Sequence, residues 1–81
     1  QTLQMLVSVP KKCFKRAVKR NRVKRQVREA FRMAKQPLAE LLTDRDETLD
    51  VAFIWLDSNL HPSEEVRAKV EKLLRRIGER L

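Results

Sequence analysis

Basic side chains are concentrated in one stretch of the sequence, between Lys11 and Lys35. Of these 25 residues, 12 are Lys or Arg and only Glu29 is acidic, which gives a charge of +11 (12 − 1). The rest of the chain has seven basic and ten acidic residues, or −3, and the sum is the net charge of +8. A single block of cations is typical of proteins that bind the phosphate backbone of a nucleic acid. The chemistry that this block predicts is therefore binding.

The basic stretch is also patterned as a helix, because its apolar residues recur at intervals of three and four. These apolar positions are Val23, Val27, Ala30, Phe31, Ala34, Leu38, Leu41 and Leu42. The cations begin at the border of this stripe and continue around the far side of the helix. There they repel one another by roughly a few tenths of a kcal/mol per like-charged pair. A solvated helix face usually mixes charge signs, so the pattern favours a polyanionic partner.

The other elements that must position this helix are two strands and a second helix. Leu3–Val9 alternates as a strand does. Thr48–Leu56 is the second predicted strand, and its last six residues are apolar on both faces, as in an interior strand covered by helices. Pro37 predicts either a kink or a long helix followed at once by a short one with Pro37 in its first turn. Asp57–Pro62 is a predicted loop, and Ser63 is a predicted N-cap.

The second helix, which we expect to begin at Ser63, has its own apolar stripe. Its members are Val66, Val70, Leu73, Leu74, Ile77 and Leu81. The order strand, helix, strand, helix predicts an α/β fold: a two-layer α+β sandwich with a β-α-β-α core and parallel strands joined by a crossover.

Composition restricts the class of protein further. A chain of 81 residues with 42% hydrophobic residues is expected to fold as one small domain. No apolar run approaches the roughly 18 residues of a membrane span, and no secretory signal pattern appears. We therefore expect no membrane partner and a cytoplasmic location. The chain opens on Gln1 in place of Met, so we expect its natural N-terminus to be absent.

Few residues outside the basic block could do chemistry. Asn21, between two arginines, has an amide that both donates to and accepts from a base or a hydrated metal ion. His61 has no second imidazole or thiol nearby in the sequence, and Cys13 has no base to activate it. Phe53 and Trp55 alternate on one strand face and are predicted to be core. We predict no catalytic residues and no metal site in the protein.

Two segments of the chain resemble the signature of the bacterial ribonuclease P protein family. They are VSVPKK at Val7–Lys12 and AVKRNRVKRQVREAFR at Ala17–Arg32. The family has a strand that ends in a Ser-x-x-Lys-Lys-like segment, followed by a helix that carries Arg-Asn-Arg-x-Lys-Arg-x-x-Arg. The link at Cys13–Arg16 is a little longer and more basic than in many members. The family's N-terminal helix and first strands are missing from this sequence, so residues 1–81 are expected to be one RNA-binding domain that lacks them.

The resemblance implies a function in tRNA maturation. In that family a catalytic RNA removes the 5′ leader of precursor tRNA with Mg²⁺, and the protein assists it. The family fold also implies a left-handed crossover. The implied RNA-contacting motif is Arg20, Asn21, Arg22, Lys24, Arg25 and Arg28, with Lys11, Lys12, Lys15, Arg16 and Arg32 as flanking phosphate contacts. Ser8 is expected near a cleft, between the motif helix and the open sheet face, that holds the leader.

Three other functions compete with this interpretation. A ribosomal or other structured-RNA-binding protein on a similar scaffold would carry the same charges. A basic amphipathic helix for membranes or protein partners would need a free apolar face, which the strands require. A self-sufficient nuclease would need an acid–base pair. Without the family's first strands, we also expect the strand Leu3–Val9 to leave an edge or an apolar face through which the chain self-associates.

Overall fold

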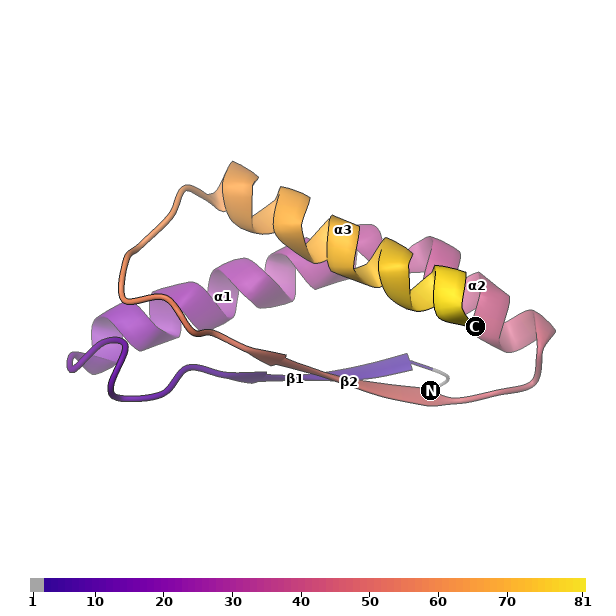
Figure 1. Ribbon diagram of the computed structural model, residues 1–81, viewed down its shortest axis with the longest axis horizontal. Coiled ribbons are helices and arrows are strands. Elements are labelled where there is room, and N and C mark those ends of the chain that lie inside the picture. Colours follow the sequence, from indigo (N-terminus) through magenta and orange to yellow (C-terminus); the bar gives the residue numbers. More distant parts are fainter. Residues whose placement is uncertain (1–2) are drawn as a thin grey trace.

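A pair of strands and a layer of three helices make up the structure, a computed structural model that describes residues 3–81 (Figure 1). In chain order the elements are β1 (Leu3–Ser8), α1 (Ala17–Ala34), α2 (Gln36–Asp44), β2 (Leu49–Ile54) and α3 (Ser63–Arg80). The predicted α/β class and element order are confirmed. The expectation about the start of the chain at Gln1 lies outside the described residues.

The two strands pair in parallel along their whole length. Leu3 lies opposite Leu49 and Ser8 lies opposite Ile54. Just beyond β2, the backbone N–H of Trp55 donates to the carbonyl oxygen of Ser8 at 2.9 Å. Parallel neighbours cannot be joined by a tight turn, so the chain must cross over between them. Here α1 and α2 form that crossover, which places the basic helix directly on the sheet.

The described helices all cover one face of the sheet and leave the other face open (Figure 1). Val7 and Val51 on the covered face are buried, whereas on the open face Leu6 is 66% exposed and Ile54 is 61% exposed. The prediction that the second strand is an interior strand covered on both faces is therefore wrong. Its continuous apolar run lies in a strand with one covered face, because the crossover and α3 both pack on the same side.

The core lies between this sheet face and the packed pair α1 and α3. On α1 the side chains of Val23, Val27, Ala30 and Phe31 are buried, as the periodicity predicts. On α3 the buried residues are Val66, Val70 and Leu74. Leu73 was predicted to be buried with them, but it is 40% exposed. It lies at the edge of the stripe, where it lines an open space beside Phe53 of β2.

Pro37 separates two helices that share one apolar phase. α1 ends at Ala34, Lys35 keeps helical backbone angles, and α2 starts at Gln36 with Pro37 in its first turn. The missing N–H of Pro37 costs little there, since the first N–H groups of a helix have no partner within it. Leu38 and Leu42 remain buried beneath α2. Of the two predicted alternatives, the structure shows the long helix followed at once by a short one.

Gln26 is a buried polar residue on the basic helix that sequence reasoning missed. Its Nε2 atom donates to the carbonyl oxygen of His61 at 3.0 Å and to Oγ of Ser63 at 3.1 Å. Ser63 is the first residue of α3, not its N-cap, and makes no side-chain cap hydrogen bond. The prediction of an N-cap is wrong by one residue, because Pro62 occupies the cap position and its carbonyl oxygen accepts from the backbone N–H of Val66 at 3.2 Å. The Ser63 hydroxyl accepts from Gln26. This contact fixes the start of α3 to the middle of α1.

We expect Gln26→Ala to lower the free energy of unfolding by about 1–3 kcal/mol, because it leaves the His61 carbonyl without its donor. Urea denaturation followed by circular dichroism measures the change. Gln36→Ala is the matched control, since Gln36 is exposed and bonds only to Glu40, one turn away. Equal effects of the two substitutions would show that the contact from α1 to α3 does not stabilise the fold.

Candidate nucleic-acid interface

One side of α1 gathers four of the six residues of the predicted RNA-contacting motif, together with Arg32, into a single surface. A shallow hollow there is lined by Asn21, Lys24, Arg25, Arg28, Glu29 and Arg32. All six come from successive turns of the helix, on the side away from its buried stripe. Five of them were predicted from the sequence as motif or flanking contacts. We call this set the α1 surface.

The α1 surface carries cations with little local compensation. Arg32 pairs with Glu29 at 2.5 Å, and this is the only ion pair that the described residues make on α1. The first turn of α1 contains no acidic residue, although acidic side chains are favoured there by the helix dipole. Lys24, Arg25 and Arg28 therefore keep their charge free for an external anion. Arginine forks among them suit phosphate oxygens.

Arg20 has a different role from the rest of the motif. Its Nη1 atom donates to the carbonyl oxygens of Phe14 at 2.8 Å and of Lys15 at 2.9 Å. It thereby holds the segment before α1 against the helix. Arg22, by contrast, is exposed, although it does not line the hollow. Of the first two arginines of the motif, one supports the fold and the other is free to bind.

The segment between β1 and α1 is a basic surface with an apolar underside. Four cations that we predicted as phosphate contacts are exposed: Lys11, Lys12, Lys15 and Arg16. Cys13 and Phe14 between them are buried in the core, at 8% and 5% exposure. The thiol of Cys13 lies 3.5 Å from the carbonyl oxygen of Trp55. These two residues anchor the segment, so its cations are held in a fixed place before the start of α1.

Ser8 lies on the open face of the sheet. It is exposed, and its partner in the parallel register is Ile54, on the same open face. Because side chains alternate along a strand, Ser8 points away from α1, which packs on the other face. The structure thus does not bring Ser8 together with the α1 surface. It places Ser8 beside Leu6 and Ile54, two exposed apolar side chains.

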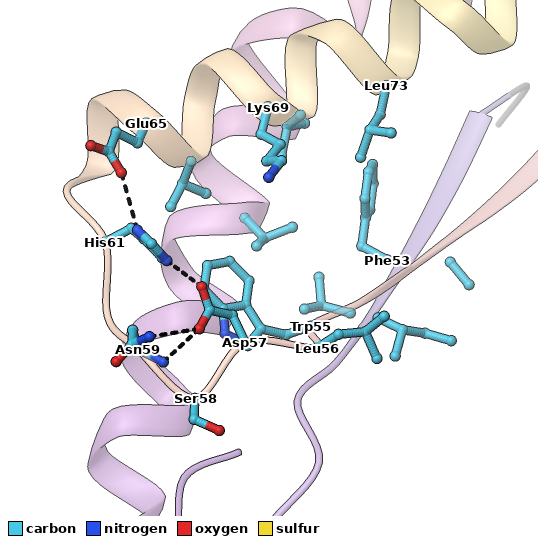
Figure 2. A pocket seen from close by; sticks show the side chains of 16 residues that line it. Phe53, Trp55, Leu56, Asp57, Ser58, Asn59, His61, Glu65, Lys69 and Leu73 are labelled. Carbon is cyan, nitrogen blue, oxygen red and sulfur yellow. Dashed lines mark hydrogen bonds and ion pairs between the residues drawn. The ribbon is translucent and has the colours of Figure 1, made fainter.

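A groove of about 880 Å³ runs between β2 and α3, and sequence reasoning did not predict it (Figure 2). Phe53 and Trp55 line it from the strand side, and Lys69 and Leu73 line it from α3. Phe53 packs edge-to-face on Phe31, with ring centroids 6.2 Å apart. The prediction that Phe53 and Trp55 belong to the core holds in part, because both rings pack on the core but are only half-buried.

His61 closes one end of this groove by bonding to two carboxylates. Its Nε2 atom lies 2.5 Å from Oδ2 of Asp57, and its Nδ1 atom lies 3.1 Å from Oε2 of Glu65 (Figure 2). The hydrogen bonds to Asp57 and then to Glu65 raise the pKa of His61 above its ordinary value. The hydrogen bond with His61, followed by that from Asn59, lowers the pKa of Asp57. In the sequence, Asp57 and Glu65 each lie four residues from His61, and this spacing is the signal from which the cluster could have been found.

Within residues 3–81, no group of three or more His, Cys, Asp or Glu side chains could hold a metal ion. No helix in the same range is long and apolar enough to cross a membrane.

Comparisons with known proteins identify relatives of the chain. The family model described as ribonuclease P matches residues 1–78. The chain is similar to the ribonuclease P protein components of two strains of Porphyromonas gingivalis, at 48% identity over 74 residues in each case. The match covers 91% of this chain and 54% of each relative, so the chain spans about half the length of these curated relatives. No solved structure matches it.

We expect the His61 cluster to make stability depend on pH. The pKa of His61 is raised in the folded state, so its contribution is complete below the ordinary value of 6.5 and is lost as the pH rises through the raised value. The pKa of Asp57 is lowered, so its contribution is present above 3.8 and is lost as the pH falls further.

Melting temperatures of the parent and of His61→Gln, measured from about pH 4.5 to about pH 9, test this expectation. The difference between them should be largest at the acidic end and should shrink above neutral pH. Asp57→Asn should remove most of this dependence as well. Parallel curves for parent and His61→Gln would contradict the assigned protonation.

Proposed function

Because the chain belongs to the ribonuclease P protein family, we propose that it acts as the protein subunit of ribonuclease P. In this role it binds the catalytic RNA and assists that RNA in removing the 5′ leader of precursor tRNA. The enzyme is then a ribonucleoprotein endoribonuclease in which the RNA carries the chemistry. Both Porphyromonas gingivalis relatives bear the name ribonuclease P protein component. The partners proposed here are the catalytic RNA and precursor tRNA.

The observation that carries this proposal is the charge on the α1 surface. The family resemblance rests on Ala17–Arg32, and the side chains of this segment that are not buried are mostly free cations. Lys24, Arg25 and Arg28 stand on consecutive turns with Asn21 among them. A helix face of this kind presents several charge-assisted donors to phosphates in fixed positions. RNA bound there would also relieve the repulsion between neighbouring cations.

The remaining predicted contacts extend this surface. Lys11, Lys12, Lys15 and Arg16 precede α1 and would contact phosphates next to those bound by the helix. Ser8 would take part in leader binding and not in these phosphate contacts, because it lies on the open face of the sheet. We propose that the leader passes along that open face, beside Ser8, Leu6 and Ile54, where exposed apolar side chains can contact unstacked bases.

Mg²⁺ enters this proposal as a cofactor of the RNA. Phosphates that approach one another in a folded RNA need counter-ions, and the exposed cations of α1 supply positive charge to the same phosphates. The protein would thereby replace part of the ionic screening that the RNA needs. Its own residues bind and orient RNA and are not assigned a step in the cleavage.

Replacing Arg22 and Arg25 together by Ala should weaken binding to the catalytic RNA by at least about tenfold, since each arginine can make charge-assisted hydrogen bonds to phosphate. The free energy of unfolding should barely change, because both side chains are exposed. Filter-binding titrations at one fixed salt concentration measure the affinity. Arg67→Ala with Arg75→Ala removes two arginines from α3 and is the matched control.

Two results of this titration would count against the proposal. The first is equal affinity of the Arg22 and Arg25 double variant and the parent. The second is equal affinity of the parent for the catalytic RNA and for a ribosomal RNA fragment of the same length, which would favour a general structured-RNA-binding protein.

The protein alone should not cleave precursor tRNA at any Mg²⁺ concentration. Added to the catalytic RNA, it should lower the Mg²⁺ concentration at which that RNA reaches half of its maximal cleavage rate. The reason is that protein cations screen the same phosphates. Cleavage assays on end-labelled precursor tRNA, run with and without protein, give both readings. Cleavage by highly purified protein free of RNA would place the chemistry in the protein and refute the proposal.

A further inference from the structure

The side of α3 that borders the groove carries a second line of cations. At 100° per residue, Arg76 and Arg80 each lie within about 20° of Lys69 around the helix axis, and Lys72 lies about 60° from Lys69. Lys69 itself lines the groove between β2 and α3. From Lys69 to Arg80 the line extends about 17 Å, at 1.5 Å per residue. We call these four residues the α3 stripe.

The two sides of α3 differ in how their charges are compensated. On the side that faces α2, Arg75 pairs with Glu71 at 3.4 Å, and Arg67 lies next to them in a hollow between α2 and α3. Among the described residues, no member of the α3 stripe has an acidic partner within 4 Å, the limit for an ion pair. Glu65, one turn before Lys69, bonds to His61 instead.

Apolar side chains line the groove beside this stripe. Leu73 on α3 is 40% exposed, and Leu56, just past β2, is 78% exposed. Both line the groove with Phe53 and Trp55, and Figure 2 shows Leu73 above the Phe53 ring. A wall of apolar and aromatic groups next to a row of cations is the arrangement that holds single-stranded nucleic acid, whose phosphates and bases need these two kinds of contact.

We infer that the groove between β2 and α3 binds a single-stranded segment of RNA, with its phosphates along the α3 stripe and its bases against Leu73, Leu56 and Trp55. This site is separate from the α1 surface, since none of the residues that line the hollow on α1 lines the groove. It differs from the open face at Ser8, because neither Ser8 nor Leu6 lines the groove, although Ile54 borders both. The inference adds a second RNA contact to the proposed function.

The charges at the groove fix where the strand lies. Asp57 and Glu65 occupy the end next to the start of α3, where carboxylates repel phosphate, although His61 bonds to both. The α3 stripe begins in the groove at Lys69 and continues from there toward the C-terminal end of α3. The phosphates of the RNA segment therefore lie along α3 from Lys69 onward, while its bases reach Leu73, Leu56 and Trp55 in the groove. An anionic membrane does not fit this surface, because the apolar stripe of α3 that it would need is buried in the core.

Trp55 provides a local signal for binding at this site. It is the only tryptophan in the chain, and it lines the groove. We would titrate the 81-residue protein with an oligouridylate of about ten nucleotides, a length within the range of single-strand sites. Trp55 fluorescence reports on the groove, while the anisotropy of a labelled oligonucleotide reports on total binding. Quenching of Trp55 that saturates with the oligonucleotide is the expected result.

Variants on the two sides of α3 locate the binding surface. Lys69→Gln with Arg76→Gln should weaken the binding seen by Trp55. It should also lower the slope of log affinity against log salt by about 1.4, because a single strand contributes about 0.7 per neutralised phosphate. Arg67→Gln with Arg75→Gln removes the same charge from the opposite side and should leave the slope near that of the parent. Lys72→Gln with Arg80→Gln is a second test of the stripe, should the first pair disturb folding.

The outcomes separate this inference from the proposed function. Arg22→Ala with Arg25→Ala should weaken binding to the catalytic RNA but leave the Trp55 titration close to that of the parent. Equal losses from both sides of α3, or binding by anisotropy without a change in Trp55, would overturn the groove site and leave the α1 proposal intact. Equal quenching by polyglutamate of the same length would also overturn it, since the surface would then suit an acidic protein segment.

Discussion

Burial of the apolar stripe on α1 is the interaction on which the rest of the structure depends. Neighbouring cations on this helix repel one another, and no acidic residue in its first turn offsets them. Each like-charged pair costs roughly a few tenths of a kcal/mol. Full burial of a Val or Phe side chain contributes about 1.5–3 kcal/mol, and Val23, Val27 and Phe31 are all buried. Packing therefore outweighs repulsion, and the helix can keep its cations facing outward.

The same helix is also held at specific points by polar contacts from its own basic segment. Arg20 bonds to two carbonyl groups of the preceding segment, and Gln26 bonds across to the start of α3. Both residues lie within the stretch that resembles the family signature, between side chains that are exposed. The signature thus combines residues that bind with residues that fix the helix in place. For that reason the exposed cations stand on a surface of defined shape, which reduces the entropy lost when RNA binds.

Packing all the helices on one side of a two-stranded sheet has consequences for both faces. The covered face holds the core, and the open face exposes Leu6 and Ile54. At the edge of β2 the sheet and α3 diverge, and the groove forms there with His61 at one end. On α3 the paired charges face α2, whereas the α3 stripe runs along the side that borders the groove, with Lys69 in its lining. Most exposed cations of the described residues thus lie on α1, on the segment before it and on α3.

The sequence by itself determined the elements and the main binding helix, because both depend on local patterns. Apolar spacing located α1, α2 and α3, alternation located β1, and charge density identified the helix that carries Asn21 and Arg25. Only the tertiary structure decided which residues of that helix are free. The sequence shows only that Arg20 and Gln26 are polar. Their roles follow from their contacts, which for Arg20 are with the segment just before α1 and for Gln26 are with His61 and Ser63, far along the chain. The apolar run of β2 likewise could not show that one face stays open, since strand coverage depends on where helices pack. The groove and its His61 cluster exist only because β2 and α3, separated by a loop, meet in space.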